Sequence, residues 1–98
     1  MAILSFRDTA TSDINYGHGS KLALKRLPKE LHDRVRLKLA RLHAATSMLD
    51  LSTLPGNRLE KLYGDRAGQH SIRINNRYRI CFFWSERGAD QVEIVDYH

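Results

Sequence analysis

The side chains best suited to chemistry gather between residues 56 and 98. Within this stretch Arg73 and Arg79 each stand between two apolar residues, and the sequence ends in Asp96-Tyr97-His98. Because successive side chains of a strand point to opposite faces, the two arginines would share the face that turns away from the apolar core. A solvated sheet face is the ordinary interpretation of any single arginine of this kind. The grouped pattern instead favours a cationic site.

Several catalytic templates are missing from the sequence. It has no GxxxxGK[ST] or GxGxxG loop for a nucleotide and no CxxC, HxH or HExxH pattern for a metal, so we expect no cofactor. The remaining Arg, Lys, Tyr and His side chains suit metal-independent cleavage of RNA by its own 2′-hydroxyl. That reaction needs a base for the hydroxyl, cations for the charge developing at phosphorus, and a proton donor for the departing 5′-oxygen. DNA lacks the 2′-hydroxyl, so such a site would be specific for RNA.

The segment that must position these side chains is typical of a β-meander. Three β-branched or aromatic runs, separated by turn formers at Asn75-Asn76 and at residues 87–90, predict strands over residues 70–74, 78–84 and 92–95. Weaker patterns predict further strands over residues 2–6 and 59–63. His70 alternates with the isoleucines of its run, so we expect it to pack at the edge of the core.

The strongest helical pattern runs from residue 28 to residue 46. Apolar side chains recur there at three- and four-residue steps and would share one buried face, namely Leu27, Leu31, Val35, Leu39, Leu42 and Ala45. Asp8 would cap a short helix over residues 8–16, and residues 21–26 form either a helical turn or a basic hinge. Residues 48–56 are predicted to be a connection, with Leu49, Leu51 and Leu54 packed on the core. These elements predict an α+β fold, a small mainly antiparallel sheet with two N-terminal helices on one face.

Length, composition and charge limit the class of protein. The 98 residues, 42% of them hydrophobic, predict a single domain over residues 1–98 with one modest core. We expect Cys81 to be a small buried hydrophobe in a reducing cytoplasm. No apolar run approaches the ~18–20 residues that span a bilayer, so we expect a soluble cytoplasmic protein.

The net charge of +5 is distributed unevenly along the chain. Residues 18–46 hold eight Lys or Arg against two acids, whereas residues 57–98 hold seven against six. The helical segment would therefore supply general attraction to a polyanion, while the sheet segment uses a few cations at chosen positions.

Four motifs are similar to those of one known family. GDRAGQHSIRINNRYRICFFW, VEIVDYH, PGNRLEKLYG and AILSFRD resemble the HigB-like toxins, also called plasmid maintenance system killer proteins, of the RelE/ParE superfamily. The resemblance implies a RelE-like fold and the toxin of a bacterial type II toxin–antitoxin pair. Such toxins cut mRNA in the ribosomal A site, beside 16S rRNA, and a HigA-like helix-turn-helix antitoxin neutralises them and binds operator DNA on behalf of the complex. ParE-type toxins of the same superfamily inhibit DNA gyrase instead, and a basic RNA-binding module that never cuts is a third alternative.

The resemblance also implies roles for individual residues. Arg79 matches the family's phosphate-binding arginine, and Asp96, Tyr97 and His98 match its C-terminal catalytic residues. Further cations are expected to bind RNA, and these are Arg58, Lys61, Arg66 and Arg73 in the sheet segment and Arg34, Lys38 and Arg41 on the basic helix.

One region departs from the family pattern. Some HigB proteins carry a His and a Lys in the strand before the GDR motif, whereas this sequence has Glu60 and Tyr63 there. The second acid/base group of the site is therefore left open. Arg66 and Arg73 could also be structural partners of Asp65 or Glu93 rather than RNA ligands.

Overall fold

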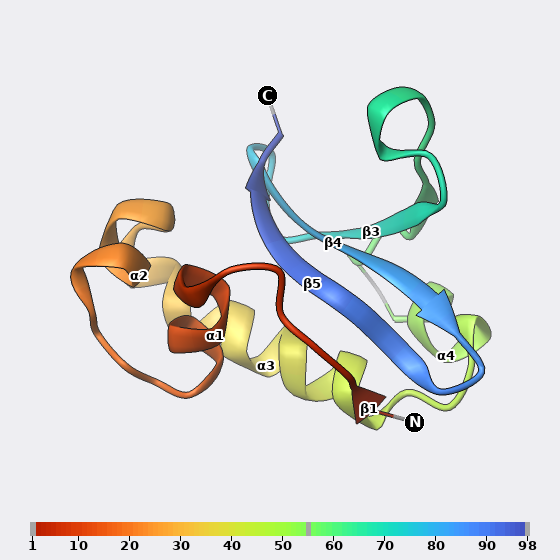
Figure 1. The fold of residues 1–98 in the computed structure, drawn as a ribbon, viewed down its shortest axis with the longest axis horizontal. Helices are drawn as coiled ribbons and strands as arrows, with labels where there is room; N and C mark the ends of the chain where they lie inside the picture. The colour runs from red at the N-terminus through yellow and green to blue at the C-terminus, as the bar shows by residue number, and fades with distance from the viewer. Residues whose placement is uncertain (1, 55, 98) are drawn as a thin grey trace.

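The computed structural model describes residues 2–54 and 56–97 and has the predicted α+β architecture (Figure 1). In chain order the elements are β1 (Ala2–Ile3), α1 (Thr9–Asn15), α2 (Lys21–Arg26), the 3₁₀ helix η1 (Lys29–Leu31), α3 (His32–Ala44), α4 (Met48–Ser52), β2 (Glu60–Lys61), the 3₁₀ helix η2 (Gly64–Arg66), β3 (Gln69–Arg73), β4 (Tyr78–Ser85) and β5 (Gly88–Asp96). The strands form one sheet in the order β1-β5-β4-β3-β2. In this sheet β1 runs parallel to β5, and every other neighbouring pair is antiparallel.

The core lies between this sheet and the helices, with α1, α2 and α3 gathered on one side of β5 (Figure 1). Val35, Leu39 and Leu42 of α3 are fully buried in the same cluster as Ile80 of β4 and Ile94 of β5. The other members of the predicted apolar stripe are buried or half-buried, so that prediction is confirmed. The sheet face that turns away from this cluster is left to carry the polar side chains.

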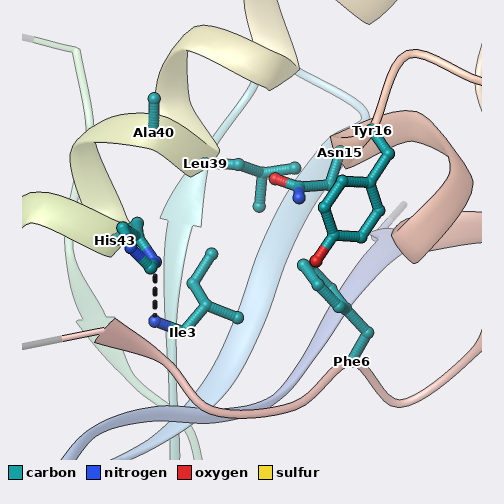
Figure 2. A pocket seen from close by; sticks show the side chains of 7 residues that line it. All are labelled: Ile3, Phe6, Asn15, Tyr16, Leu39, Ala40 and His43. Atoms are coloured by element: carbon teal, nitrogen blue, oxygen red, sulfur yellow. Dashed lines mark hydrogen bonds between the residues drawn. The ribbon is translucent and has the colours of Figure 1, made fainter.

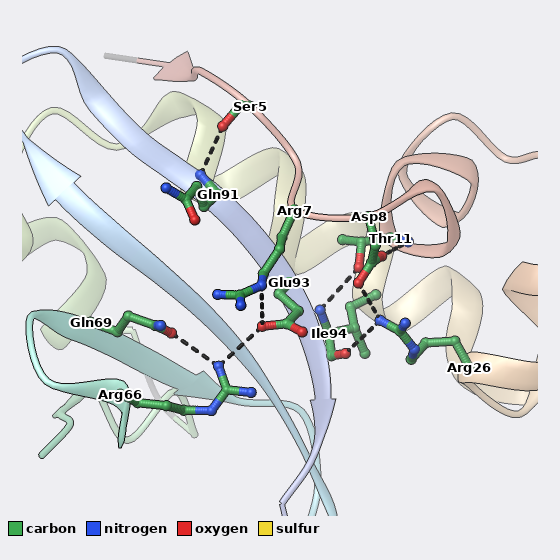
Figure 3. Close-up of polar contacts among 10 residues, drawn as sticks. All are labelled: Ser5, Arg7, Asp8, Thr11, Arg26, Arg66, Gln69, Gln91, Glu93 and Ile94. Atoms are coloured by element: carbon green, nitrogen blue, oxygen red, sulfur yellow. Dashed lines mark hydrogen bonds and ion pairs between the residues drawn. The ribbon is translucent and has the colours of Figure 1, made fainter. Parts of the chain in front are cut away.

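Asp8 ties α1 and α2 to β5 (Figure 3). Its carboxylate accepts a hydrogen bond from the Thr11 amide at 2.8 Å, which caps α1 as predicted, and pairs with Arg26 Nη1 at 2.7 Å. Arg26 also donates to the Ile94 carbonyl at 3.0 Å. Burial tends to raise the pKa of Asp8, but the hydrogen bonds from Arg26 and Thr11 outweigh it and hold the pKa below its usual value.

The three strands of the predicted meander are confirmed, but the turn predicted over residues 87–90 is wrong. The connection is tighter, because Ser85 pairs with Gly88 and β5 begins there. Gly88 has φ +138°, and a Cβ at this position would lie 1.9 Å from the carbonyl oxygen of Ala2. Glycine is thus required for β1 to lie against β5, rather than for a turn. A β-bulge then shifts the register of β4 and β5 between Cys81 and Phe83.

The single helix predicted over residues 28–46 is divided in the structure. Pro28 precedes η1, and α3 begins only at His32, whose Nε2 lies 2.8 Å from the carbonyl oxygen of Leu27. Residues 21–26 form helix α2 rather than a hinge. Within the described ranges, no helix is both long and apolar enough to cross a membrane.

A further helix, α4, occupies part of the predicted connection over residues 48–56. Ser47 caps it by accepting from the Asp50 amide at 3.3 Å, a signal too local for the apolar periodicity to reveal. Leu51 is buried as expected, but Leu49 is 68% exposed and does not pack on the core. The described residues therefore contain four α-helices, more than the two predicted N-terminal ones.

Two reactive side chains of the sheet are packed as predicted. Cys81 is fully buried, and burial raises the pKa of its thiol. The His70 ring stacks on Phe82 with 6.3 Å between ring centroids. Its Nδ1 is buried with no hydrogen-bond partner among the described residues. Burial lowers the pKa of His70, and the charge of Lys61 lowers it further.

Candidate functional site

Arg79 lies on β4, and oxygen atoms of two neighbouring segments hold its guanidinium group. Its Nε donates to Ser71 Oγ of β3 at 2.6 Å, and its Nη2 donates to the carbonyl oxygen of Arg58 at 2.6 Å. Arg79 is only 8% exposed, so it is not the solvated side chain that the ordinary interpretation would place here. Holding so flexible a side chain in one orientation costs conformational entropy, which these two hydrogen bonds help to offset.

Among the described residues, no acid forms a hydrogen bond with Arg79. Its acceptors there are neutral oxygens, and Glu60 Oε2 lies 3.9 Å from Nη2 as a longer ion pair. Within the described part of the chain, Nη1 takes part in no hydrogen bond. A planar guanidinium that is fixed in this way and keeps a free edge is suited to binding two oxygens of a phosphate.

The structure separates the predicted C-terminal residues. The Tyr97 ring lies beside Arg79, with 5.9 Å between the ring centroid and the guanidinium carbon. Asp96 is the register partner of Tyr78, so its side chain points to the other face, where it accepts from Arg77 Nη2 at 2.8 Å. His98 lies outside the residues that the structure describes. Among the described residues, Tyr97 is therefore the member of this group that accompanies Arg79.

Strand β2 and the residues beside it form one wall of the site. Arg58 has φ +44° and turns its carbonyl toward Arg79, while its own side chain is exposed. Glu60 and Lys61 are both exposed, and Glu60 is the one within 4 Å of Arg79. Tyr63 is 77% exposed and contributes no contact to Arg79.

Arg66 occupies a different environment from Arg79. Figure 3 shows its guanidinium group between Gln69 and Glu93. Its Nη1 donates to Glu93 Oε1 at 3.0 Å and to Gln69 Oε1 at 3.1 Å, and Arg7 Nε lies 3.9 Å from the same Glu93 oxygen. Burial alone would lower the pKa of Arg66, but the hydrogen bond and charge of Glu93 reverse the effect and raise it. The structural partnership that we considered for Arg66 is thus the one observed.

Four other predicted cations gather around one concavity of about 390 Å³, namely Arg34, Lys38 and Arg41 of α3 and Arg73 of β3. Lys38 Nζ donates to Asn57 Oδ1 at 2.9 Å, and the Arg73 guanidinium donates to the Asn76 side chain. Burial lowers the pKa of Lys38, and the charges of Arg41, Arg34 and Arg73 lower it further. These cations therefore lie close enough to one another to interact.

Two residues that position cations of the site were not predicted from the sequence. Ser71 is fully buried and accepts from Arg79, and Asn57 is 4% exposed and accepts from Lys38. Ser71 alternates with the core residue Ile72, so the sequence pattern places it on the same sheet face as Arg73 and Arg79. Asn57 follows Gly56 in a stretch whose residue types indicate only a turn. Nothing in the sequence indicates its contact with Lys38 of α3.

An apolar pocket of about 350 Å³ lies on another side of the molecule, between β1, α1 and α3 (Figure 2). Ile3, Phe6, Tyr16 and Leu39 line it. At its rim the Ile3 amide donates to His43 Nδ1 at 3.1 Å, which places the ring proton of neutral His43 on Nε2. This hydrogen bond ties β1 to α3, and the pocket includes none of the predicted site residues.

A mixed five-stranded sheet with helices packed on one face and an arginine fixed by neutral oxygens on the other places the chain in the RelE-like class of toxins. The family model of HigB-like toxins, described as the RelE-like toxin of the type II toxin-antitoxin system HigB, matches residues 5–98, and the chain belongs to this family.

A relative from one bacterium supports the same assignment. Toxin HigB-1 of Vibrio cholerae serotype O1 (strain ATCC 39315 / El Tor Inaba N16961) is 41% identical over 58 residues. The matched region is 59% of this chain and spans 61% of the length of that relative.

Among the described residues, no group of three or more His, Cys, Asp or Glu side chains is arranged to hold a metal ion.

Proposed function

We propose that this protein is a toxin that cuts ribosome-bound mRNA, without a metal, by means of the RNA's own 2′-hydroxyl. The observation that carries the proposal is Arg79, which is fixed by neutral oxygens and keeps its charge available to a phosphate. The reaction builds up charge on the oxygens around phosphorus, and a preorganised cation stabilises such charge without having to reorient during the reaction. Family membership over residues 5–98 supports the same proposal.

In the proposed reaction the 2′-oxygen forms a bond to phosphorus while the bond to the 5′-oxygen breaks. The base takes the proton of the 2′-hydroxyl, and an acid supplies a proton to the departing 5′-oxygen. The products are a 2′,3′-cyclic phosphate on one fragment and a 5′-hydroxyl on the other. Arg79 would bind the phosphate oxygens, and the Tyr97 ring would support the guanidinium and lie against the substrate.

We assign the base to Glu60 and the acid to His98. Among the described residues, Glu60 has the carboxylate that pairs with Arg79 at 3.9 Å, and it is half exposed, so it can meet a substrate held there. It also occupies the position at which the sequence departs from some HigB proteins, and it would fill the acid/base role left open by that departure. His98 carries the acid role through its match to the family's C-terminal motif, and an unperturbed imidazole with a pKa of ~6.5 can give up a proton near neutral pH. Asp96, which pairs with Arg77, would fix the last strand rather than touch the substrate.

The proposed partners follow from the same assignment. A HigA-like helix-turn-helix antitoxin would neutralise the toxin and carry the complex to operator DNA, and the ribosome, with its 16S rRNA, would present the message. Positive charge concentrated on residues 18–46 supports docking on ribosomal RNA. Ribosome-bound mRNA should therefore be a much better substrate than free RNA.

Brief expression in bacteria, followed by mapping of mRNA 5′ ends beside a gyrase supercoiling assay, tests the proposal. We expect new 5′-hydroxyl ends in translated messages within minutes and unchanged supercoiling. New supercoiling defects without RNA ends would indicate a ParE-like gyrase inhibitor. Growth inhibition with neither change would indicate an RNA-binding module that does not cut. Arg79→Ala serves as the matched control, because it should remove the ends while the protein still binds its antitoxin.

A further inference from the structure

The concavity between α3 and the end of β3 collects positive charge, and no acid is among the described residues that line it. We call it the basic notch and define it by Arg34, Lys38, Arg41 and Arg73. The rest of its lining consists of apolar, glycine and asparagine residues, without a carboxylate. On surfaces of mixed charge, neighbouring acids and bases usually balance each other, as Arg66 and Glu93 do elsewhere in this protein. The basic notch has no such balance.

Two of the four cations are held in place by neutral asparagine side chains. Lys38 Nζ donates to Asn57 Oδ1 at 2.9 Å, and Asn57, itself almost fully buried, is fixed by donating from Nδ2 to the carbonyl oxygen of Leu51 at 3.1 Å. Arg73 bonds to the side chain of Asn76. These contacts use neutral oxygens, so they orient the cations and leave their charges uncancelled. Mutual repulsion between charges held in this way is relieved when an anion binds among them.

The basic notch is continuous with the Arg79 site. Arg73 and Arg79 are register partners on β3 and β4, so their backbones are direct neighbours. The Asn57-Arg58 segment contacts both regions, since Asn57 holds Lys38 and the carbonyl of Arg58 holds Arg79. A polyanion that binds Arg79 with one of its charged groups can therefore reach the basic notch with a neighbouring one. A nucleic acid strand has this character because it carries a phosphate at every residue.

We propose that the basic notch is a second phosphate-binding site, which holds backbone phosphates of the RNA strand whose scissile phosphate lies at Arg79. This inference rests on the proposed function, because it takes the ligand at Arg79 to be RNA. It assigns RNA binding to a set of side chains other than Arg79, and gives them a different role. The basic notch binds the strand beyond the cleavage point and contributes affinity, whereas Arg79 contributes to the chemical step.

RNA suits the basic notch better than an acidic protein segment for a structural reason. Three of its four cations are arginines, whose planar forks match paired phosphate oxygens. The acidic segment is the alternative that the experiment must distinguish.

The test compares two double variants that remove equal charge. Arg34→Gln/Arg41→Gln alters the basic notch, and Arg7→Gln/Arg87→Gln alters two exposed cations before α1 and in the β4–β5 turn. The probe is a single-stranded RNA oligonucleotide with 2′-O-methyl groups, which cannot be cut, and its binding is followed by fluorescence anisotropy across a salt series. A single-stranded contact contributes ~0.7 to the slope of log K against log salt, so the notch variant should lose about 1.4 from the slope. Its affinity should fall roughly 10- to 100-fold, and the control should stay near the wild type.

Equal affinities and slopes for the two double variants would overturn the inference. It would also be overturned if a polyglutamate peptide bound the wild type as tightly as the RNA and lost the same affinity in the notch variant. Thermal unfolding of both variants, whose substituted side chains are exposed, checks that each is folded.

Cleavage of ribosome-bound mRNA separates this inference from the proposed function. If both double variants cut as fast as the wild type at every substrate concentration, the inference fails and the proposed function stands. A notch variant with raised KM and unchanged kcat supports the inference. If the wild type cuts nothing, the proposed function fails, whatever the anisotropy shows.

Discussion

Replacing Arg79 with lysine separates the shape of the guanidinium group from its charge. Arg79 makes one hydrogen bond to Ser71 Oγ and one to the Arg58 carbonyl, both at 2.6 Å, and keeps a further edge for the substrate. A lysine keeps the positive charge but has no planar fork, so it cannot hold these two acceptors and also bind two phosphate oxygens. We therefore expect Arg79→Lys to behave almost like Arg79→Ala in cleavage.

The two costs of this substitution can be set against each other. A hydrogen bond from a charged group contributes about 1.5–3 kcal/mol, and the partly exposed Arg58 carbonyl can recover water, so we expect a stability loss of about 1–3 kcal/mol. A domain of this size is stable by about 5–15 kcal/mol, so the variant should stay folded. Loss of a preorganised donor to the developing charge should slow cleavage by about 10²–10³-fold.

Single-turnover cleavage of ribosome-bound mRNA gives the rate, and urea denaturation gives the stability. Arg87→Lys, in the exposed β4–β5 turn, is the matched control and should leave both unchanged. The reasoning is refuted if Arg79→Lys cuts within about threefold of the wild type, because that corresponds to less than 1 kcal/mol of transition-state stabilisation. A variant that does not fold would refute the stability estimate instead.

Three further predictions concern groups that exchange protons. Glu60→Gln keeps the shape of the side chain but removes the proposed base, so the single-turnover rate should fall by about 10²–10⁴ with ribosome binding retained; an unchanged rate would exclude Glu60 as the base. Deleting His98 should cost a similar factor and flatten the dependence of cleavage on pH around ~6.5, whereas matching pH profiles for the two proteins would rule out proton transfer by His98. His70→Phe should change how stability depends on pH. The pKa of His70 is lowered in the folded state, so below pH ~6.5 the unfolded chain binds more protons and the wild type loses stability as the pH falls. The variant should lack this loss in denaturant midpoints measured at about pH 7.5 and pH 5, and parallel losses would contradict the assignment.

Local sequence patterns sufficed for the meander and for the buried face of α3. Both depend on periodicity, since alternating residues determine a strand face and steps of three and four determine a helix face. The start of β5 was not predictable in the same way. Gly88 reads as a turn former, but it is a strand residue because the backbone of Ala2 approaches it too closely for any side chain. That approach depends on the pairing of β1 with β5, which joins opposite ends of the sequence.

The site was predictable in its main residue but not in its environment. Alternation placed Arg79 on the face opposite the core, and the family motif marked it as a phosphate ligand. Neither indicated that Ser71 and the Arg58 carbonyl would bury and orient it. The sheet face to which the Asp96 side chain points could not be predicted either, because the sequence does not show which residues at the end of β5 face the core. The register settles it, since Asp96 pairs with Tyr78 and so turns away from the face of Arg79.

The way in which each arginine's charge is balanced distinguishes a structural role from a functional one on this surface. Arg66 donates to the Glu93 carboxylate, which leaves little net charge to attract a substrate. The ion pair also connects η2 to β5. Arg79 is more deeply buried than Arg66, yet its hydrogen bonds go to neutral oxygens. Burying a cation is costly unless an anion or strong hydrogen bonds compensate, and a structure that orients the cation without cancelling it keeps a strong field for a ligand. By this criterion we expect Arg66 to stabilise the fold and Arg79 to bind the substrate.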